Sequence, residues 1–590
     1  MNLGSIVILI FTIFPFIYSF YNESLKEPQL KELEKIFYNN SLNNNNKMNL
    51  FLKSKNDKVS LSDEEKCSYC TNIFSNVNNY FLSKNNDFQY IYNFGKMVCS
   101  YLYDSDSCIS IINEYGPIVM KNFVELLNNT NRFCSILNLC KNQQNDNNFE
   151  NWAENLLKNK PSKKRENINF NKNNIYNMIQ ITDIHYDPKY MEGADTKCSK
   201  PICCRENNNK DTIKSGKYGF CGNCDINDNL INSAFDSISQ LNPDFIIWTG
   251  DMGPHDLWDS NQEKIYNITR YLLNLYDKKL GNIPLFPILG NHEKYPNDEF
   301  SFDNDSTLLQ TFADIYKPYL DEEAYQSFSK YGYYSQKYLN TNLRIVGLNC
   351  LICDTFNFNL LNDKKLPKQQ FDWLEKILLS AEKNNEFVYI LDHIPINANF
   401  YLSECAKRMQ VLLDRFEYII RGYFSGHTHF DDIAIVTTYK DKIPNIINYI
   451  APALTTFPSI YPSYRNYIID KQTMQIFNYE QYRLNVTQAN IDNKANWYLS
   501  HNANNFFNVN DMTEVNKIYE YVVGNDYMIK RYADAPKGYE LSKKEKIVKE
   551  AQCTIKEFSY ENWMKCSHPS FDLDQAQLFN ILNKLGGYWE

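Results

Sequence analysis

Six of the eight histidines in this chain lie in five short motifs that also carry aspartate or asparagine. A histidine that follows a strand is often structural when it stands alone. Imidazole nitrogens together with carboxylate and amide oxygens, however, are the ligands that borderline divalent metals take in proteins. Five such motifs in one chain therefore predict a metal centre. The motifs are Asp183-Ile-His185, Gly250-Asp251-Met-Gly-Pro-His255, Gly290-Asn291-His292-Glu293, Asp392-His393-Ile-Pro and Gly426-His427-Thr-His429, whereas His501 and His568 lie outside them.

Each motif closes a short apolar run that is typical of a β-strand: YNMIQITD, FIIWTGD, PLFPILGNH, FVYILDH and YFSGH. A further run, NLRIVGLNC, lacks such an end, and longer helical patterns lie between the runs, for example at 230–241 and 370–379. Strands that alternate with helices predict an α/β fold whose sheet is covered on both faces. Such sheets bind ligands outside the carboxyl ends of their strands, so the motifs are expected to meet at one edge.

The spacing inside the motifs supports the same site. In Asp183-Ile-His185 and His427-Thr-His429, alternation along a strand predicts that both side chains point to the same side. The glycines at positions 250, 290 and 426 permit a sharp turn of the backbone beside an ion.

Residues 63–145 contain six of the sixteen cysteines, with helix-length apolar patterns between them. Since so few residues form only a marginal core, we expect a small helical domain with three disulfides. Six cysteines allow fifteen pairings, and their spacing alone does not choose among them. The CxxC at the start of this block has no histidine or second CxxC nearby, so zinc is not expected there.

The cysteines and the N-terminus indicate the secretory pathway. Residues 1–20 are apolar without acidic or basic side chains and fit a signal peptide cleaved near Ser19 or Phe20, with a membrane anchor as the alternative. No other segment offers the roughly 20 apolar residues of a membrane span. A net charge of −9 without a basic stripe does not suggest nucleic-acid binding. Six glycosylation sequons, at Asn22, Asn39, Asn128, Asn267, Asn304 and Asn485, also fit an oxidising compartment.

In this order the five motifs resemble those of the calcineurin-like metallophosphoesterases. Residues 63–145 resemble a saposin-type domain, a lipid-binding module of amphipathic helices, and the combination is similar to the acid sphingomyelinase family. The resemblance covers roughly residues 63–570. Local agreement includes GDxxxHxxW from Gly250 to Trp258, YIAPA from Tyr449 to Ala453 and NVTQAN from Asn485 to Asn490.

The resemblance implies an α/β fold with a metallophosphoesterase sheet sandwich flanked by helices and preceded by an all-α, disulfide-bonded saposin-type domain. We expect a signal peptide at residues 1–20, the saposin-type domain at 63–145 and a linker at 146–172. The catalytic domain is expected at 173–481, followed by a helical C-terminal region at 482–590.

For the metal centre, the resemblance implies two Zn²⁺ per chain, although iron and manganese accept the same ligands. Two cations roughly 3.5–4 Å apart can activate a hydroxide that attacks phosphorus in line, opposite the leaving alkoxide. One ion would take Asp183, His185 and His429, the other Asn291, His393 and His427, and Asp251 would bridge both.

His255 and His292 stand beside these ligands but belong to neither set. An alkoxide leaving group needs a proton, and an imidazolium is a suitable donor at acidic pH. We expect one histidine to supply this proton and the other to bind the phosphoryl oxygens, with His292 favoured as the acid; support of the neighbouring ligands is the alternative. The resemblance also implies a tyrosine near the substrate head group. Tyr464 is the candidate, whereas Tyr467 fits ordinary strand packing.

The resemblance further implies six disulfides, and the spacing of Cys553 and Cys566 suits a seventh, local one. Cys221 and Cys350 stay unmatched: they pair with each other or remain free, and an exchange of roles between Cys221 and Cys224 stays open. The implied pairs are Cys67–Cys140, Cys70–Cys134, Cys99–Cys108, Cys198–Cys203, Cys204–Cys224 and Cys353–Cys405.

Together these features favour a secreted or lysosomal zinc-dependent phosphodiesterase that hydrolyses sphingomyelin to ceramide and phosphocholine, a phospholipase C-type reaction. The saposin-type block carries the lipid assignment, because the metal site alone serves many phosphoesterases. The expected partner is membrane lipid, reached by peripheral contact of a monomeric chain. A secreted phosphodiesterase of soluble nucleotides is the enzymatic alternative. A lipid-binding protein with a degenerate metal site is a second one, although all seven ligands are present.

Overall fold

The computed structural model describes residues 63–523 apart from 84–87, 100–103, 137–139, 141–144, 164, 167, 169, 209–212, 363–364 and 397–399. The expected signal peptide, the sequons at Asn22 and Asn39 and the Cys553–Cys566 disulfide lie outside these residues.

Four helices form the N-terminal part of the described chain: α5 (Asp63–Ser83), α6 (Gln89–Cys99), α7 (Ser105–Leu127) and α8 (Thr130–Ile136). Their apolar side chains, among them Ile111, Met120 and Phe133, form a core separate from the main one. A core of this size depends on cross-links. The three that tie the helices are the pairs implied above, Cys67–Cys140, Cys70–Cys134 and Cys99–Cys108. The predicted disulfide-bonded helical domain is therefore confirmed.

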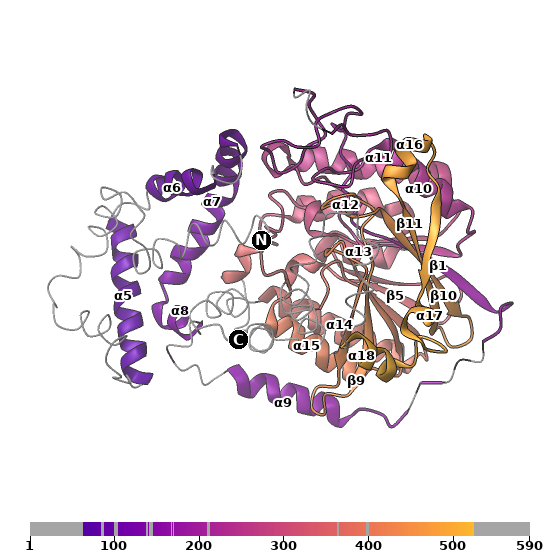
Figure 1. The fold of residues 1–590 in the computed structure, drawn as a ribbon. Helices are drawn as coiled ribbons and strands as arrows, with labels where there is room; N and C mark the ends of the chain where they lie inside the picture. Colours follow the sequence, from indigo (N-terminus) through magenta and orange to yellow (C-terminus); the bar gives the residue numbers. More distant parts are fainter. Residues whose placement is uncertain are drawn as a thin grey trace.

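The helical domain packs onto the α/β body through α7, at the left of the molecule in Figure 1. Helix α7 contacts two short 3-10 helices of the body, η2 (Leu257–Asp259) and η6 (Phe358–Leu361). Ser110 Oγ donates to the Trp258 carbonyl at 2.8 Å, and Arg132 Nη2 donates to the Leu361 carbonyl at 2.7 Å. The apolar core of the helical domain continues into the body through Phe356 and Phe358. The two parts thus share one apolar interface.

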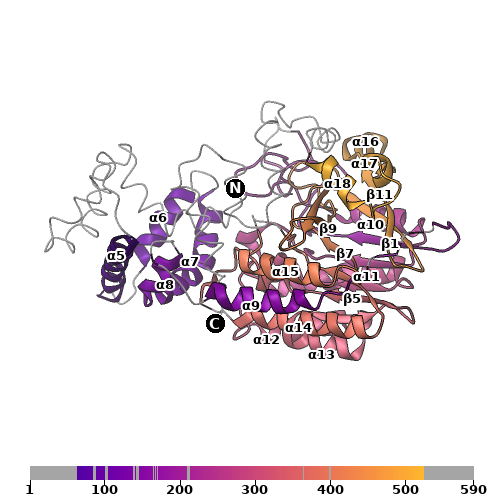
Figure 2. The same ribbon diagram turned by 90° about the horizontal axis from the view of Figure 1, so that it is seen from below.

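The segment predicted as a linker, 146–172, is wrong for its first half, because Asn145–Lys158 forms helix α9. Phe149, Ala153 and Leu156 recur at helical spacing and join the core of the α/β body. Helix α9 runs alongside α15 (Ser403–Arg415) in Figure 2. Asparagine-rich composition hid this apolar stripe, and α9 docks as part of the body.

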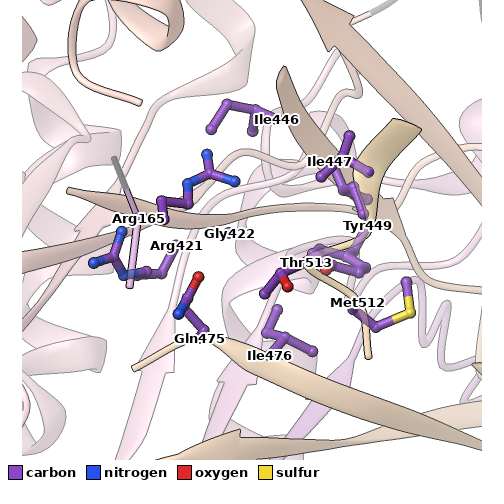
Figure 3. A pocket seen from close by; sticks show the side chains of 11 residues that line it. Arg165, Arg421, Gly422, Ile446, Ile447, Tyr449, Gln475, Ile476, Met512 and Thr513 are labelled. Atoms are coloured by element: carbon purple, nitrogen blue, oxygen red, sulfur yellow. The ribbon is translucent and has the colours of Figure 1, made fainter. Parts of the chain in front are cut away.

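The second half of that segment also lies against the body. Arg165 donates to the carbonyls of Glu417 at 2.9 Å and Asn445 at 3.3 Å. Beside it is a cavity of about 20 Å³, lined by Gly422 and Gln475 among others (Figure 3). This volume has room for about one water molecule. The cavity therefore offers no substrate site.

Two six-stranded mixed sheets form the centre of the α/β body, as the sandwich prediction required. In the first, β1, β2 and β3 are parallel; in the second, β5, β6, β7 and β9 are parallel. All residues of β2 and β7 are buried, as expected for parallel strands covered on both faces. The first sheet has the order β12 (Trp497–Asn502), β11 (Ile476–Leu484), β10 (Ser463–Asp470), β1 (Ile175–Ile181), β2 (Phe245–Trp248), β3 (Leu285–Pro287). The second has the order β4 (Tyr334–Lys337), β5 (Leu343–Gly347), β6 (Phe387–Leu391), β7 (Ile420–Ser425), β9 (Pro444–Ile450), β8 (Asp432–Thr437).

Helices cover the outer faces of the sheets (Figure 1). The two helices predicted from apolar spacing are α10 (Asp228–Ser239) and α14 (Lys365–Lys383). Asn227 begins α10 by accepting a hydrogen bond from the Leu230 amide at 3.1 Å, and a buried stripe that includes Phe235 faces the first sheet. None of the helices in the described part of the chain is long and apolar enough to cross a membrane. The others include α11 (Gln262–Leu280), α12 (Ser306–Tyr316), α13 (Glu322–Tyr331), η3 (Asn291–Glu293), η4 (Lys317–Tyr319) and η5 (Cys350–Ile352).

The expected helical C-terminal region is only partly helical over its described residues, 482–523. Three helices are present, α16 (Val486–Asp492), α17 (Ala503–Phe507) and α18 (Val515–Val522). The expected boundary at residue 481, however, cuts strand β11, and Trp497–Asn502 adds the edge strand β12 to the first sheet. These residues belong to the α/β body, because β12 pairs with β11 and extends the first sheet beyond the last ligand motif.

Candidate metal centre

The seven predicted ligands converge where β1, β2 and β3 of one sheet and β6 and β7 of the other end. Each motif follows the carboxyl end of its strand, as predicted. A first group forms around His185: its Nε2 lies 3.1 Å from His429 Nε2, which lies 3.4 Å from Asp183 Oδ1. A second group forms around Asn291. Side chains that are far apart in sequence therefore share one small volume.

In the second group, Asn291 Oδ1 lies 3.0 Å from His393 Nε2 and 3.0 Å from His427 Nδ1. Asp251 lies between the groups, with Oδ2 at 3.5 Å from His185 Nε2 and 3.1 Å from His393 Nε2. One carboxylate thus faces both sets of nitrogen and oxygen donors. The structure brings the seven side chains together, whereas their division between two metals with Asp251 as the bridge stays a prediction.

The outward ring nitrogens of three histidines test whether this cluster fits metal ions. The Nδ1 atoms of His185, His393 and His429 lie 2.8, 2.6 and 2.7 Å from the carbonyls of Gly253, Thr249 and Phe457. A carbonyl only accepts, so Nδ1 carries a proton in each ring and Nε2 is the nitrogen that faces the centre. Two Nε2 atoms only 3.1 Å apart, as in His185 and His429, repel unless a proton or a metal cation lies between them. The fold and these groups together imply divalent metal ions.

The local backbone explains how the ligands reach the centre. Five of them have left-handed φ: Asp183 (49°), His185 (45°), Asp251 (61°), His427 (67°) and His429 (65°). Residues other than glycine adopt this region at a cost of order 1–3 kcal/mol, and such strain gathers at functional sites. We expected alternation along a strand to turn both side chains of Asp183-Ile-His185 and of His427-Thr-His429 to the same side. That explanation is wrong, because these residues lie in tight turns after the strands.

Glycine is required at one point of this backbone. A Cβ on Gly290 would lie 2.2 Å from Asp251 Oδ1, closer than side-chain contacts allow. The loop before Asn291 can therefore approach the bridging carboxylate only without a side chain.

Electrostatics prepare both kinds of ligand. Burial disfavours the charge on Asp251, but the neighbouring His393 and His292 outweigh it and hold the pKa of this carboxyl well below its usual range. Burial and the charge of His393 lower the pKa of His427 to about 3. These shifts keep the Asp251 carboxylate ionised and the His427 imidazole neutral, the forms that bind metals. At His393, by contrast, the charges of Asp251 and Asp183 outweigh burial and raise the pKa to about 10.

His255 and His292 lie beside the first group. Their ring centroids are 3.8 and 4.6 Å from that of His185 and 4.8 Å from each other. His292 Nδ1 lies 3.3 Å from the Pro254 carbonyl, while its backbone N–H donates to Asp251 Oδ1 at 2.8 Å. Both rings are therefore placed next to the ligands, as the sequence predicted, and their catalytic roles are taken up below.

Glu293, which sequence reasoning left out, holds two ligand loops together. It is fully buried and accepts from the amides of Gly290 at 2.5 Å, Met252 at 2.7 Å and Asp251 at 2.9 Å. Burial and the charge of Asp251 raise the pKa of this carboxyl to about 7. A buried acid directly after two candidate site residues was the available signal.

Tyr464 is wrong as a substrate contact. Its side chain is fully buried, its hydroxyl lies 2.7 Å from Ser237 Oγ, and its ring stacks on Tyr482 at 5.1 Å. This hydroxyl points from β10 toward α10. Tyr467 is buried as well, and its hydroxyl donates to Gln180 at 2.8 Å.

Tyr464→Phe is therefore expected to lower stability and to leave catalysis unchanged. The substitution removes one buried hydrogen bond and leaves Ser237 without that partner, which costs about 1–2 kcal/mol. Urea unfolding and steady-state kinetics check this. A rise of more than about tenfold in the KM for a choline phosphodiester would contradict this placement. Such a rise corresponds to a loss of about 1.4 kcal/mol of binding free energy.

The disulfides of the body match those implied by the resemblance: Cys198–Cys203, Cys204–Cys224 and Cys353–Cys405. Among the described cysteines, Cys221 and Cys350 are free and so do not pair with each other. Burial raises the pKa of the Cys221 thiol to about 12, which opposes a nucleophilic role.

The described sequons differ in exposure. Asn128, Asn267 and Asn304 are exposed. Asn485 is half-buried, and its side chain begins α16 by accepting from the Gln488 amide at 3.0 Å. Glycosylation of these residues stays a prediction.

Comparison with known proteins agrees with this geometry. Residues 176–431 match the model of the calcineurin-like phosphoesterase family. Sphingomyelin phosphodiesterase A of Dictyostelium discoideum is 32% identical over 457 residues, which are 72% of this chain and 77% of that protein. Cyclic GMP-AMP phosphodiesterase SMPDL3A of Bos taurus is 33% identical over 350 residues, 56% of this chain and 76% of that protein. Sphingomyelin phosphodiesterase of Homo sapiens is 30% identical over 347 residues, and 54% of its length is covered.

The sandwich and the histidine–carboxylate cluster at its strand ends define a metal-dependent phosphoesterase, and the relatives support hydrolysis of phosphodiesters. The chain belongs to the sphingomyelin phosphodiesterase family of calcineurin-like phosphoesterases.

Proposed function

We propose that this protein hydrolyses sphingomyelin to ceramide and phosphocholine with two Zn²⁺ in its metal centre. The observation that carries the lipid substrate is an apolar path from the helical domain to the ligands. Phe400 packs against the helical core, and its ring lies 4.7 Å from that of His427. On the other side of the centre, the ring of Phe457 lies 4.3 Å from that of His255. Aromatic side chains thus lie between the helical domain and the ligands, which supports a substrate with an apolar part.

The chain's own residues have separate tasks in this reaction. Asp183, His185 and His429 would hold one cation, Asn291, His393 and His427 the other, and Asp251 both. When bound, the two cations supply Lewis-acid charge and activate water. His255 and His292 face the same space, where one would donate a proton to the leaving alkoxide and the other would bind the phosphoryl oxygens, with His292 favoured as the donor.

Zinc is proposed because of the ligand types. Four imidazoles favour a borderline ion over Mg²⁺ or Ca²⁺, which prefer oxygen ligands. Iron and manganese fit the set less specifically, so metal analysis of the purified protein decides among them.

The surroundings of the site support a secreted or lysosomal enzyme. Six disulfides in the described chain favour an oxidising compartment. We propose a monomer that contacts membrane lipid peripherally through its saposin-type helical domain, without nucleic acid as a partner. The second candidate, a phosphodiesterase of soluble nucleotides, is favoured by the 33% identity to the cyclic GMP-AMP phosphodiesterase.

A pair of surface variants separates the two substrates. Leu82 and Ile109 are 51% and 41% exposed apolar residues on the helical domain. Each buried leucine-sized side chain contributes about 1.5–3 kcal/mol, so Leu82→Glu with Ile109→Glu is expected to lower hydrolysis of sphingomyelin liposomes about tenfold or more. Hydrolysis of soluble bis(p-nitrophenyl) phosphate is expected to stay unchanged. Release of phosphocholine and of p-nitrophenol measures the two activities.

The matched control places the same charges on the α/β body, at Leu339 and Ile491, which are 65% and 72% exposed. This control should hydrolyse both substrates like the unmodified protein. Deletion of residues 63–145 is a poorer test, because it uncovers Phe356 and Phe358 at the interface with α7. Unchanged liposome hydrolysis in the Leu82/Ile109 variant would count against lipid presentation and favour the soluble substrate.

A further inference from the structure

We propose that Asp225 is a positioning residue that orients the His255 ring and fixes its tautomer for phosphodiester hydrolysis; this rests on the proposed role of His255. Asp225 precedes α10, and its side chain is fully buried. Its Oδ1 lies 2.8 Å from His255 Nδ1, and its Oδ2 accepts from the His255 backbone N–H at 2.8 Å. A single carboxylate therefore holds both the ring and the main chain of this histidine.

The backbone that carries Asp225 is itself fixed. The preceding residue is cross-linked in Cys204–Cys224, and its carbonyl accepts from Thr456 Oγ1 at 2.6 Å. The following residue, Ile226, accepts from the Asp187 amide at 2.9 Å, next to the first metal motif. Thr455 Oγ1 donates to Asp225 Oδ1 at 3.2 Å. The carboxylate is thus held from three sides while it meets His255.

This contact decides which ring atom enters the site. Burial raises the pKa of the Asp225 carboxyl, but once ionised it only accepts. Nδ1 of His255 then carries a proton, and Nε2 is the nitrogen turned toward the first ligand group. His255 has a nitrogen close to the ring nitrogens of His185 and His429, and its side chain is 17% exposed, whereas Asp225 is inaccessible. His292 has a different partner, the Pro254 carbonyl at 3.3 Å. The two site histidines are therefore positioned by unlike groups.

An amide cannot replace this carboxylate. Asp225→Asn has one accepting oxygen and one donating nitrogen, yet both the backbone N–H and the ring Nδ1–H of His255 need an acceptor. Either the backbone N–H faces the new NH₂ group, or the ring takes its proton on Nε2 instead. Both outcomes change what His255 presents to the phosphodiester.

The test is a double-mutant cycle on the full chain with bis(p-nitrophenyl) phosphate, so that failure of the lipid proposal does not affect it. Asp225→Asn is expected to lower kcat about 10²-fold, within the range of a general acid or base, while KM changes less than about threefold. His255→Ala should lower kcat similarly, and the double variant should be no slower than His255→Ala. Metal content should stay that of the unmodified protein.

Asp195→Asn is the matched control. Asp195 is also buried in the disulfide-bonded segment and accepts from the Asn208 amide at 2.7 Å, and its variant should keep kcat. Thr455→Val, which removes only the donor to Asp225, should lower kcat a few-fold, and this loss should vanish in the His255→Ala background. The proposal is overturned if Asp225→Asn keeps kcat, or if the Asp225 or Thr455 effect persists in full without His255. Absent sphingomyelin hydrolysis with this cycle intact would overturn only the lipid proposal.

Discussion

Asp251→Asn is expected to abolish turnover and to lower the metal content of the centre. Asp251 Oδ2 lies 3.5 Å from His185 Nε2 and 3.1 Å from His393 Nε2, so this carboxylate contacts both donor groups. Asparagine keeps the shape but removes the negative charge between two sites for divalent cations. A loss of about 4 kcal/mol of transition-state stabilisation corresponds to about a 10³-fold fall in kcat, which we take as the minimum effect.

Two measurements check this expectation. Steady-state hydrolysis gives the loss of turnover, and mass spectrometry of the metals gives their content, which should fall from about two ions per chain to one or fewer. Asp277→Asn serves as the control, since this exposed carboxylate only accepts from the Tyr319 hydroxyl at 2.8 Å. A folded Asp251→Asn protein that retains both metals and normal turnover would sink the dimetal assignment.

The ligand set was predictable because each ligand is marked by the residues next to it in the sequence. Each ligand directly follows an apolar run, and such runs form buried parallel strands whose ends must meet. His393 and Asn291 could therefore be grouped although 102 residues separate them. The conformation was not predictable in the same way, since left-handed φ at Asp183 and His427 follows from packing around the centre.

Residues whose role depends on a partner far away in the sequence could not be predicted. Asp225 meets His255 across 30 positions and Glu293 meets Asp251 across 42, and neither has a motif of its own that names its partner. Tyr464 was misassigned because it was carried over from the resemblance, which does not show that its hydroxyl meets Ser237 of α10. Helix α9 was not predicted because asparagine and glutamate residues separate its three core side chains in the sequence.

Glu293→Gln is expected to have the second largest effect, on stability and on metal affinity together. The carboxylate accepts from Asp251 and Gly290 through Oε2 and from Met252 through Oε1. Glutamine has one accepting oxygen, so its NH₂ group must face at least one of these amides. An unsatisfied buried donor costs about 1–3 kcal/mol and the lost bonds to a charged acceptor add to this, so we expect unfolding to become easier by about 2–4 kcal/mol.

The same substitution is expected to weaken metal binding, because Glu293 joins the loop of Asp251 to the loop that carries Asn291. Loss of a residue that orients ligands typically weakens metal binding about 10–100-fold. Competition with a chromophoric chelator measures Zn²⁺ affinity, and urea unfolding with and without chelator separates the metal-dependent part of the stability. Glu263→Gln, at a side chain that is 70% exposed, is the control and should change neither quantity. If the Glu293→Gln protein binds Zn²⁺ like the unmodified protein, the ligand loops keep their arrangement without this carboxylate. The metals themselves must then offset the backbone strain at Asp251.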